Sequence, residues 1–138
     1  MTTPATTEPR STSRAAVWAG RILQLLLVLL LLFDAGMKIL KVDAVVKGSV
    51  QAGFSAAAIA PIGWVLLISL IVYVIPRTAI LGAILLTGYL GGAVATNVRM
   101  SMPLGFDLLT AILGALAWAA LYLRDERLRA MIPLRRYE

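Results

Sequence analysis

The stretch AILGAILLTGYLGGAVATNV, residues 79–98, contains twenty consecutive residues without a charged side chain. As an α-helix rising 1.5 Å per residue it would be about 30 Å long, which is the thickness of the hydrocarbon core of a bilayer. The whole chain of 138 residues is also strongly apolar, with 60% hydrophobic and 14% charged residues and a mean hydropathy of +0.88. Soluble domains carry about 25% charged residues. The sequence therefore predicts an integral membrane protein without room for a separate soluble domain.

Three more hydrophobic blocks accompany this one, at about 15–39, 59–75 and 108–123. The first is long and lacks a small-residue cleavage site, which favours an uncleaved helix over a signal peptide. We therefore expect an all-α, integral membrane four-helix bundle over 14–124. Residues 1–13 are rich in Thr, Pro and Ser and predict a disordered tail, and 125–138 predict a basic cytoplasmic tail.

The orientation follows from the Lys and Arg residues on each side of the predicted helices. Nine lie on the side of the two termini, and four lie on the other. The nine are Arg10, Arg14, Arg21, Arg77, Arg124, Arg127, Arg129, Arg135 and Arg136, and the four are Lys38, Lys41, Lys47 and Arg99. This bias predicts that both termini are cytoplasmic.

Two connections have their own signals. Pro76 and Thr78 in IPRT end one helix and begin the next, the threonine through a hydroxyl cap, which predicts an antiparallel hairpin. Residues 41–61 carry valines at helical spacing and a helix-breaking Gly53. This segment is either a short interfacial helix or a re-entrant hydrophobic loop between the first two helices.

The chain has no cysteine and no histidine. This excludes disulfides, thiol chemistry, the usual haem and zinc ligands and Ser–His or Cys–His nucleophiles. We expect no intrinsic cofactor, no metal site and no self-sufficient enzyme. The net charge of +6 belongs to block ends and tails, which indicates contact with the lipid bilayer and not with nucleic acid.

Asp34 stands near the end of the first block, in LLLLFDAGMKILK. Twelve uncharged residues separate it from Arg21, about 18 Å of helix, so both charges cannot lie outside the hydrocarbon. Arg21 can extend towards the headgroups, but Asp34 cannot and should face protein near the outer boundary. Lys38 follows in the order that favours an i, i+4 pair. Asp34 is then either a structural ion pair or a ligand or proton site.

Other polar residues fall at the same outer end of the predicted bundle. Asp107 is placed to cap the fourth helix, and Arg99 could pair with Asp34 or with Asp107. We hypothesise an outward-facing ligand site lined by Asp34, Lys38, Gln51, Asn97, Arg99 and Asp107.

Small residues repeat every four positions along the third helix, at Gly88, Gly92 and Thr96, and along the fourth at Ala111 and Ala115. Small residues let helices approach closely in lipid. The pattern predicts tight packing of these two helices within one chain, with a homodimer face as the alternative.

Four motifs resemble the DoxX-like family of small bacterial membrane proteins: IPRT, LGAILLTGYLGGAVAT, FDAGMK and VQAG. The resemblance runs over about 22–123. It implies a four-helix bundle in a bacterial inner membrane and a quinone-binding or electron-transfer accessory role beside a membrane or secreted redox partner. Asp34, Lys38, Asn97 and Arg99 are the matching positions. Asn97 stands where the family often has histidine, and asparagine cannot carry protons near neutral pH.

Three classes of function remain open from the sequence. The first is the quinone-binding accessory subunit that the resemblance implies. The second is a structural or assembly partner of other membrane proteins. The third is a small-solute or lipid transporter, although no inverted repeat is apparent.

Overall fold

The computed structural model describes residues 13–132, and all regular secondary structure in that range is helical. The predicted disordered tail, apart from Ser13, and the last six residues of the predicted basic tail lie outside the described residues. The helices are α1 (Arg14–Ile39), α2 (Asp43–Gln51), α3 (Ile59–Val74), α4 (Ala79–Arg99), α5 (Leu104–Arg124) and α6 (Glu126–Met131).

Three of these helices, α1, α4 and α5, are long and apolar enough to cross a membrane. The fourth apolar helix, α3, has 16 residues and is shorter. Large apolar side chains on all four are exposed, among them Leu25, Leu29, Ile68, Ile84 and Ile112. A surface of this kind suits lipid, so the described part of the chain is a membrane protein, as its composition predicts.

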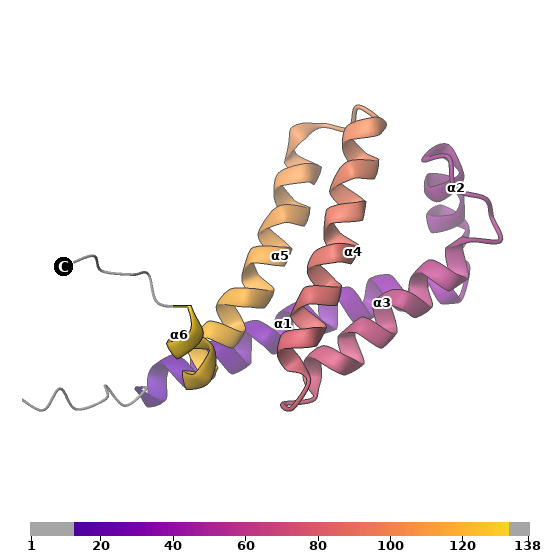
Figure 1. The fold of residues 1–138 in the computed structure, drawn as a ribbon. Coiled ribbons are helices and arrows are strands. Elements are labelled where there is room, and N and C mark those ends of the chain that lie inside the picture. Colours follow the sequence, from indigo (N-terminus) through magenta and orange to yellow (C-terminus); the bar gives the residue numbers. More distant parts are fainter. Residues whose placement is uncertain (1–12, 133–138) are drawn as a thin grey trace, which may run out of the picture.

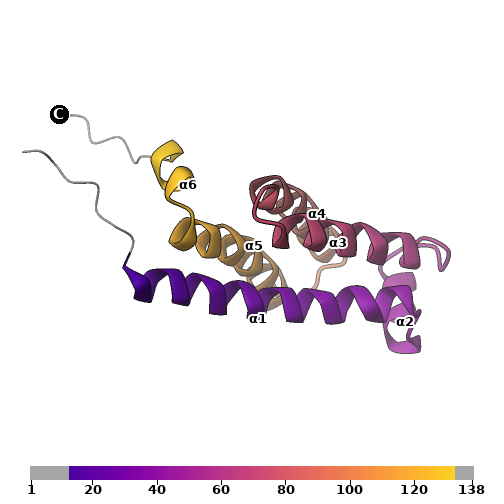
Figure 2. The ribbon, with the colours of Figure 1, turned by 90° about the horizontal axis from the view of Figure 1, so that it is seen from below.

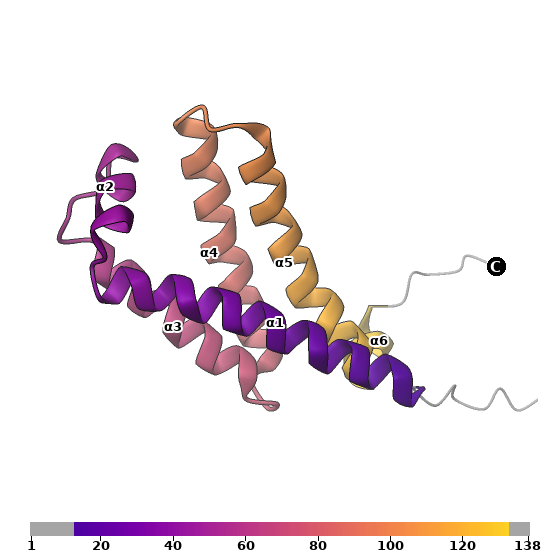
Figure 3. The same ribbon diagram turned by 180° about the vertical axis from the view of Figure 1, so that it is seen from behind.

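The apolar helices pack in a ring in which α1 contacts α3 and α5, and α4 contacts α3 and α5. Figure 1 shows α4 and α5 side by side as a hairpin, with α1 and α3 inclined to them. Figure 3 shows α1 as a long diagonal across the molecule. The shared core is made of leucine, alanine and tyrosine, including Leu31, Leu66, Tyr73, Ala83, Leu86 and Leu121.

Three glycines allow these helices to approach closely. A Cβ atom built on Gly20 of α1 would lie 2.8 Å from Arg124 Cγ on α5. One on Gly63 of α3 would lie 2.9 Å from Lys38 Cβ on α1, and one on Gly82 of α4 would overlap the backbone of Tyr73. Each of these helix contacts therefore requires glycine, because the packed interior leaves no volume for a side chain there.

Tyr73 connects α3 to α5 across the core. Its side chain is fully buried, and its hydroxyl donates a hydrogen bond of 2.7 Å to the Ala117 carbonyl. A buried hydroxyl needs such a partner. The bond therefore fixes the position of α3 relative to α5 on the opposite side of the ring.

The connections agree in part with the sequence. The segment after α1 forms the helix α2, as the short-helix interpretation predicts, and Gly53 follows it with φ +86°. Thr78 is the N-cap residue of α4, but its hydroxyl donates to the Val72 carbonyl instead of capping the helix. The predicted hydroxyl cap is therefore wrong.

The start of the predicted basic tail is folded. α6 follows α5 after Asp125, whose carboxylate accepts the backbone N–H groups of Arg127 and Leu128 as an N-cap. Leu128 is 3% exposed and joins the core. Figure 2 shows α6 at the same end of the molecule as the first turns of α1.

Candidate functional site

The ion pair between Asp34 and Lys38 is confirmed. The Lys38 ammonium donates to the Asp34 carboxylate one helical turn away. The Lys38 side chain is 18% exposed and that of Asp34 is 42% exposed. Asp34 is therefore paired with a charge on its own helix, and its side chain stays partly exposed.

Arg99 pairs with neither of the two expected aspartates. Its guanidinium Nη2 donates a hydrogen bond of 2.6 Å to the carbonyl of Ala52, and the same nitrogen would lie 3.1 Å from a Cβ atom on Gly53. Arg99 thus ties the end of α4 to the connection between α2 and α3. The absence of a side chain at Gly53 leaves space for the guanidinium.

Asp107 is not the N-cap of α5, and that interpretation is wrong. The helix begins four residues earlier than the hydrophobic block, at Leu104, with Pro103 as the N-cap residue. Asp107 is inside the first turn, where the positive end of the helix dipole still favours its carboxylate. Its Oδ1 atom is buried and has no hydrogen-bond partner among the described residues.

The remaining two outer-end residues form no contact that would complete a site. Gln51 is exposed at the end of α2, and Asn97 is half-buried near the end of α4. In residues 13–132 the ion pair of Asp34 and Lys38 is the one hydrogen bond or ion pair that joins members of the hypothesised six-residue site. None of the six lines either of the two cavities described below.

The glycine stripe of α4 does not pack against α5. Gly88 and Gly92 are exposed, and a Cβ atom on either would meet nothing within 4 Å. The two helices instead approach where Leu90 reaches Gly114, 3.7 Å from a Cβ atom built there. The predicted packing within one chain is therefore wrong for Gly88 and Gly92. The stripe of Gly88 and Gly92 lies on an outer face of the helix.

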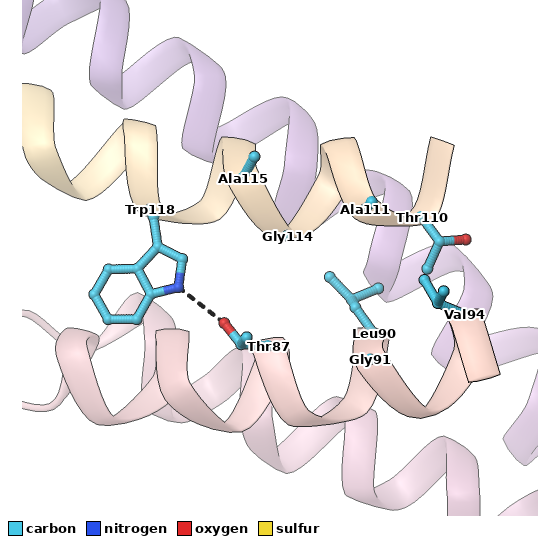
Figure 4. Close-up of a pocket in the computed structure, with 9 residues that line it drawn as sticks. All are labelled: Thr87, Leu90, Gly91, Val94, Thr110, Ala111, Gly114, Ala115 and Trp118. Carbon is cyan, nitrogen blue, oxygen red and sulfur yellow. Dashed lines mark hydrogen bonds between the residues drawn. The ribbon is translucent and has the colours of Figure 1, made fainter. Parts of the chain in front are cut away.

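A groove of about 350 Å³ lies between α4 and α5, on a different face of α4 from Gly88 and Gly92. It runs along the middle of both helices, and its small residues Gly91, Ala111 and Ala115 are exposed. Figure 4 shows the lining side chains, which are Thr87, Leu90, Gly91, Val94, Thr110, Ala111, Gly114, Ala115 and Trp118. The groove exists because glycine and alanine occupy positions where larger side chains would close it.

One end of the groove carries a pair of polar groups. The indole Nε1 of Trp118 donates a hydrogen bond of 2.8 Å to the Thr87 hydroxyl, as Figure 4 shows. The Thr87 hydroxyl in turn donates to the Ala83 carbonyl, 2.7 Å away. The hydroxyl of Thr110, which donates to the Phe106 carbonyl, lies at the other end. The groove is thus apolar along its length, with hydrogen-bond donors at its ends.

This arrangement can hold a ligand but cannot transfer protons by itself. Tryptophan and threonine supply N–H and O–H donors, and no lining residue titrates near neutral pH. In the described range no group of three or more His, Cys, Asp or Glu residues could hold a metal ion. The groove is suited to an apolar molecule that carries a hydrogen-bond acceptor.

Trp118 and Thr87 are not recognisable as a pair in the sequence. They are 31 residues apart, and a tryptophan near the end of a hydrophobic block is typical of an aromatic belt at the membrane surface. Only the pairing of α4 with α5 brings them together. The place of Gly91 in the groove is also not apparent from the sequence, because Gly91 falls outside the four-residue repeat of Gly88 and Gly92.

Comparison with known proteins gives one match. The model of the DoxX-like family matches residues 22–120, which include α3, α4, both arms of the groove and all but the first turns of α1. No curated protein and no solved structure matches the chain. The matched range is most of the 138 residues, and the chain belongs to the DoxX-like family.

Proposed function

We propose that this protein is an accessory membrane subunit that holds a lipid-soluble quinone in the groove between α4 and α5. The observation that carries the proposal is the groove itself, about 350 Å³ in volume and located halfway along two membrane-spanning helices. This volume lies in the range of about 300 to 1,000 Å³ that is usual for small-molecule sites. A quinone diffusing in the bilayer could enter it from the lipid.

The chemistry of the lining supports a quinone. An oxidised quinone head group offers carbonyl acceptors, and the Thr87 and Thr110 hydroxyls can donate to them, while the Trp118 N–H holds the Thr87 oxygen in place. A threonine hydroxyl bonded to its own helix can turn to a ligand at small cost, because that backbone carbonyl also accepts a helical N–H. The isoprenoid tail would lie against Leu90, Val94 and the alanines of α5.

The same lining residues favour an accessory role over an enzymatic one. The chain contains no cysteine or histidine, and no group in the groove can deliver a proton to a reduced quinone. Electrons and protons would therefore come from a partner protein that carries the redox centre. The resemblance to the DoxX-like family pointed to the same role.

For the membrane itself we propose four spans, with α3 crossing beside the three longer helices and both termini in the cytoplasm of a bacterium. α3 is about 24 Å long, and tilting of neighbours or local thinning of the bilayer can accommodate it. The excess of arginine on the side of the termini supports this orientation.

The test is to measure quinone binding before and after the groove is filled. Decylubiquinone would be titrated into protein in phosphatidylcholine nanodiscs, and quenching of tryptophan fluorescence would be recorded. Replacing the exposed Trp18 and Trp64 by Phe leaves Trp118, in the groove, as the reporter. In this background Gly91→Leu should weaken binding about tenfold or more, because the leucine occupies ligand volume.

The matched control is Gly88→Leu. It makes the same change one turn away on the same helix, at another exposed glycine with nothing within 4 Å, but outside the groove lining. Quinone binding should stay within about twofold of the parent, since changes away from packed sites have small effects. Equal affinity of Gly91→Leu and the parent protein would show that the quinone does not use the groove.

A second candidate, a structural or assembly partner, is favoured by the open glycine face of α4. Gly88 and Gly92 leave a flat strip on which another membrane helix can pack closely. Chemical cross-linking in native membranes would test it. Association that Gly88→Leu abolishes and Gly91→Leu leaves intact would support assembly through this face.

A further inference from the structure

A second crevice, of about 260 Å³, lies at the end of the molecule where α1 begins and α5 ends. It is formed by the first turns of α1, the turn between α3 and α4, and the last turn of α5. Its charged members are Arg21, Arg124 and Asp125, and its apolar wall includes Val17, Pro76 and Leu121.

Within residues 13–132 neither Arg21 nor Arg124 forms an ion pair with a carboxylate. The Arg21 guanidinium lies over the ring of Trp18, 5.8 Å from its centre, which leaves the N–H groups at its edge free to bind. The acid in the lining, Asp125, is the N-cap of α6, where its Oδ1 accepts the N–H groups of Arg127 at 2.9 Å and Leu128 at 3.3 Å, and the two arginines outnumber it.

The start of α4 adds to the positive potential. Ala79, its first residue, lines the crevice, and the Thr78 hydroxyl donates to Val72 and does not cap the helix. Within residues 13–132 the first N–H groups of α4 have no side-chain cap, and the positive end of the helix dipole borders the crevice at Ala79.

We propose that this crevice binds a phosphate group, and that its occupant is the headgroup of an anionic phospholipid. Guanidinium groups bind phosphate through paired N–H donors, and here two of them come from different helices around one cavity. The crevice lies at the ends of the membrane-spanning helices, where headgroups are found, and its apolar wall suits the glycerol and upper acyl chain. Free phosphate shares the headgroup chemistry but gains nothing from that wall.

The experiment compares three ligands on protein purified in neutral detergent. Short-chain phosphatidylglycerol, short-chain phosphatidylcholine and inorganic phosphate would each be titrated by calorimetry against the parent protein, Arg21→Gln and Arg124→Gln. Glutamine keeps the Cβ and Cγ atoms of the arginine stem, and the Arg124 Cγ is the atom that lies against Gly20. Each variant should bind phosphatidylglycerol about tenfold more weakly, because it loses one charge-assisted hydrogen bond to the phosphate.

The control is Arg77→Gln, which removes the same charge from an exposed residue near the crevice but outside its lining. It should change the affinity less than about twofold, as expected for an exposed charge screened by salt. If Arg21→Gln, Arg124→Gln and Arg77→Gln weaken phosphatidylglycerol binding equally, the attraction is non-specific electrostatics, and the proposed site would be overturned. Failure of the parent protein to prefer phosphatidylglycerol over phosphatidylcholine, with no binding of phosphate, would overturn it as well.

A further outcome decides the source of the phosphate. Binding of inorganic phosphate as tight as that of phosphatidylglycerol, with the same dependence on both arginines, would support the site and assign free phosphate to it. Thermal unfolding of each variant would be recorded in parallel. If Arg124→Gln lowers the melting temperature, Arg21→Gln alone decides, because Arg21 is exposed and its replacement should disturb the packing less.

Discussion

A carboxylate on a membrane-spanning helix is stable only where a neighbouring charge or hydrogen bond compensates it, and Asp34 of α1 is in that position. Lys38 provides the compensation on the same helix, and the lysine stem is held against α3 where Gly63 leaves space. The pair lies outside both the groove between α4 and α5 and the crevice at the start of α1. This geometry favours the structural interpretation of Asp34 over a role as a ligand site.

Replacing Asp34 by Asn should therefore reduce stability and leave quinone binding unchanged. The variant loses the counter-charge of a largely buried lysine. We expect a loss of about 1 to 2 kcal/mol in the free energy of unfolding, between the values of an exposed ion pair and a buried charged hydrogen bond. Denaturant unfolding in detergent measures it.

The double variant Asp34→Asn with Lys38→Met is the control, because it removes the unpaired ammonium too and should recover most of the stability. A single variant that stays fully stable but no longer binds decylubiquinone would contradict the structural role. It would return Asp34 to the ligand site inferred from the sequence.

At the level of the helices, glycine has two opposite roles on α4. Gly82 contacts the backbone of Tyr73 on α3, so that the hairpin of α3 and α4 closes tightly next to its turn. Gly88, less than two turns further on, faces open space. The spacing of small residues in the sequence cannot separate these roles, because both residues belong to the same glycine-rich helix.

The pair Gly82→Ala and Gly88→Ala tests this difference. The first should lower the free energy of unfolding by about 1 to 3 kcal/mol, because the added methyl group overlaps backbone atoms that cannot move aside easily. The second should raise it by up to about 1 kcal/mol, since alanine favours a helix over glycine. Thermal unfolding followed by circular dichroism compares the two with the parent protein.

Equal stabilisation by Gly82→Ala and Gly88→Ala would mean that α3 and α4 do not meet as described. If Gly88→Ala destabilises as strongly as Gly82→Ala, Gly88 packs against something in the folded protein. The second copy or partner helix of the assembly function would then be the natural explanation.

At the scale of the whole molecule, the arrangement of the helices fixes which ends lie together. The start of α1, the turn between α3 and α4 and the end of α5 border one crevice. The connection between α2 and α3 is tied by Arg99 to the opposite end of α4. If α3 crosses the membrane, these two sets of residues are on opposite sides of it.

Single cysteines can test this, because the natural chain has none. In intact cells a membrane-impermeant thiol reagent should label Ser55→Cys, which precedes α3, and leave Arg77→Cys and Arg127→Cys unlabelled until the cells are permeabilised. All three positions are exposed, so access depends on the side of the membrane and not on burial in the protein. Gel-shift detection of the labelled protein gives the result.

Labelling of Ser55→Cys and Arg77→Cys from the same side would contradict the proposed four spans. It would mean that the 16 residues of α3 do not cross, and that three helices carry the protein through the membrane. Labelling of Arg127→Cys in intact cells would instead reverse the orientation of the C-terminus.

The hydrophobic blocks determined by themselves that the chain is helical and lies in a membrane, because helix length and bilayer thickness are matched by local sequence alone. The pairing of Asp34 with Lys38 was also local, since both are on one turn of one helix. The groove with Trp118 and Thr87, the contact of Arg99 with Ala52 and the crevice of Arg21 and Arg124 each join distant segments. Only the tertiary structure decided these, because in lipid the packing of side-chain shapes, and not hydrophobicity, chooses which helix faces meet.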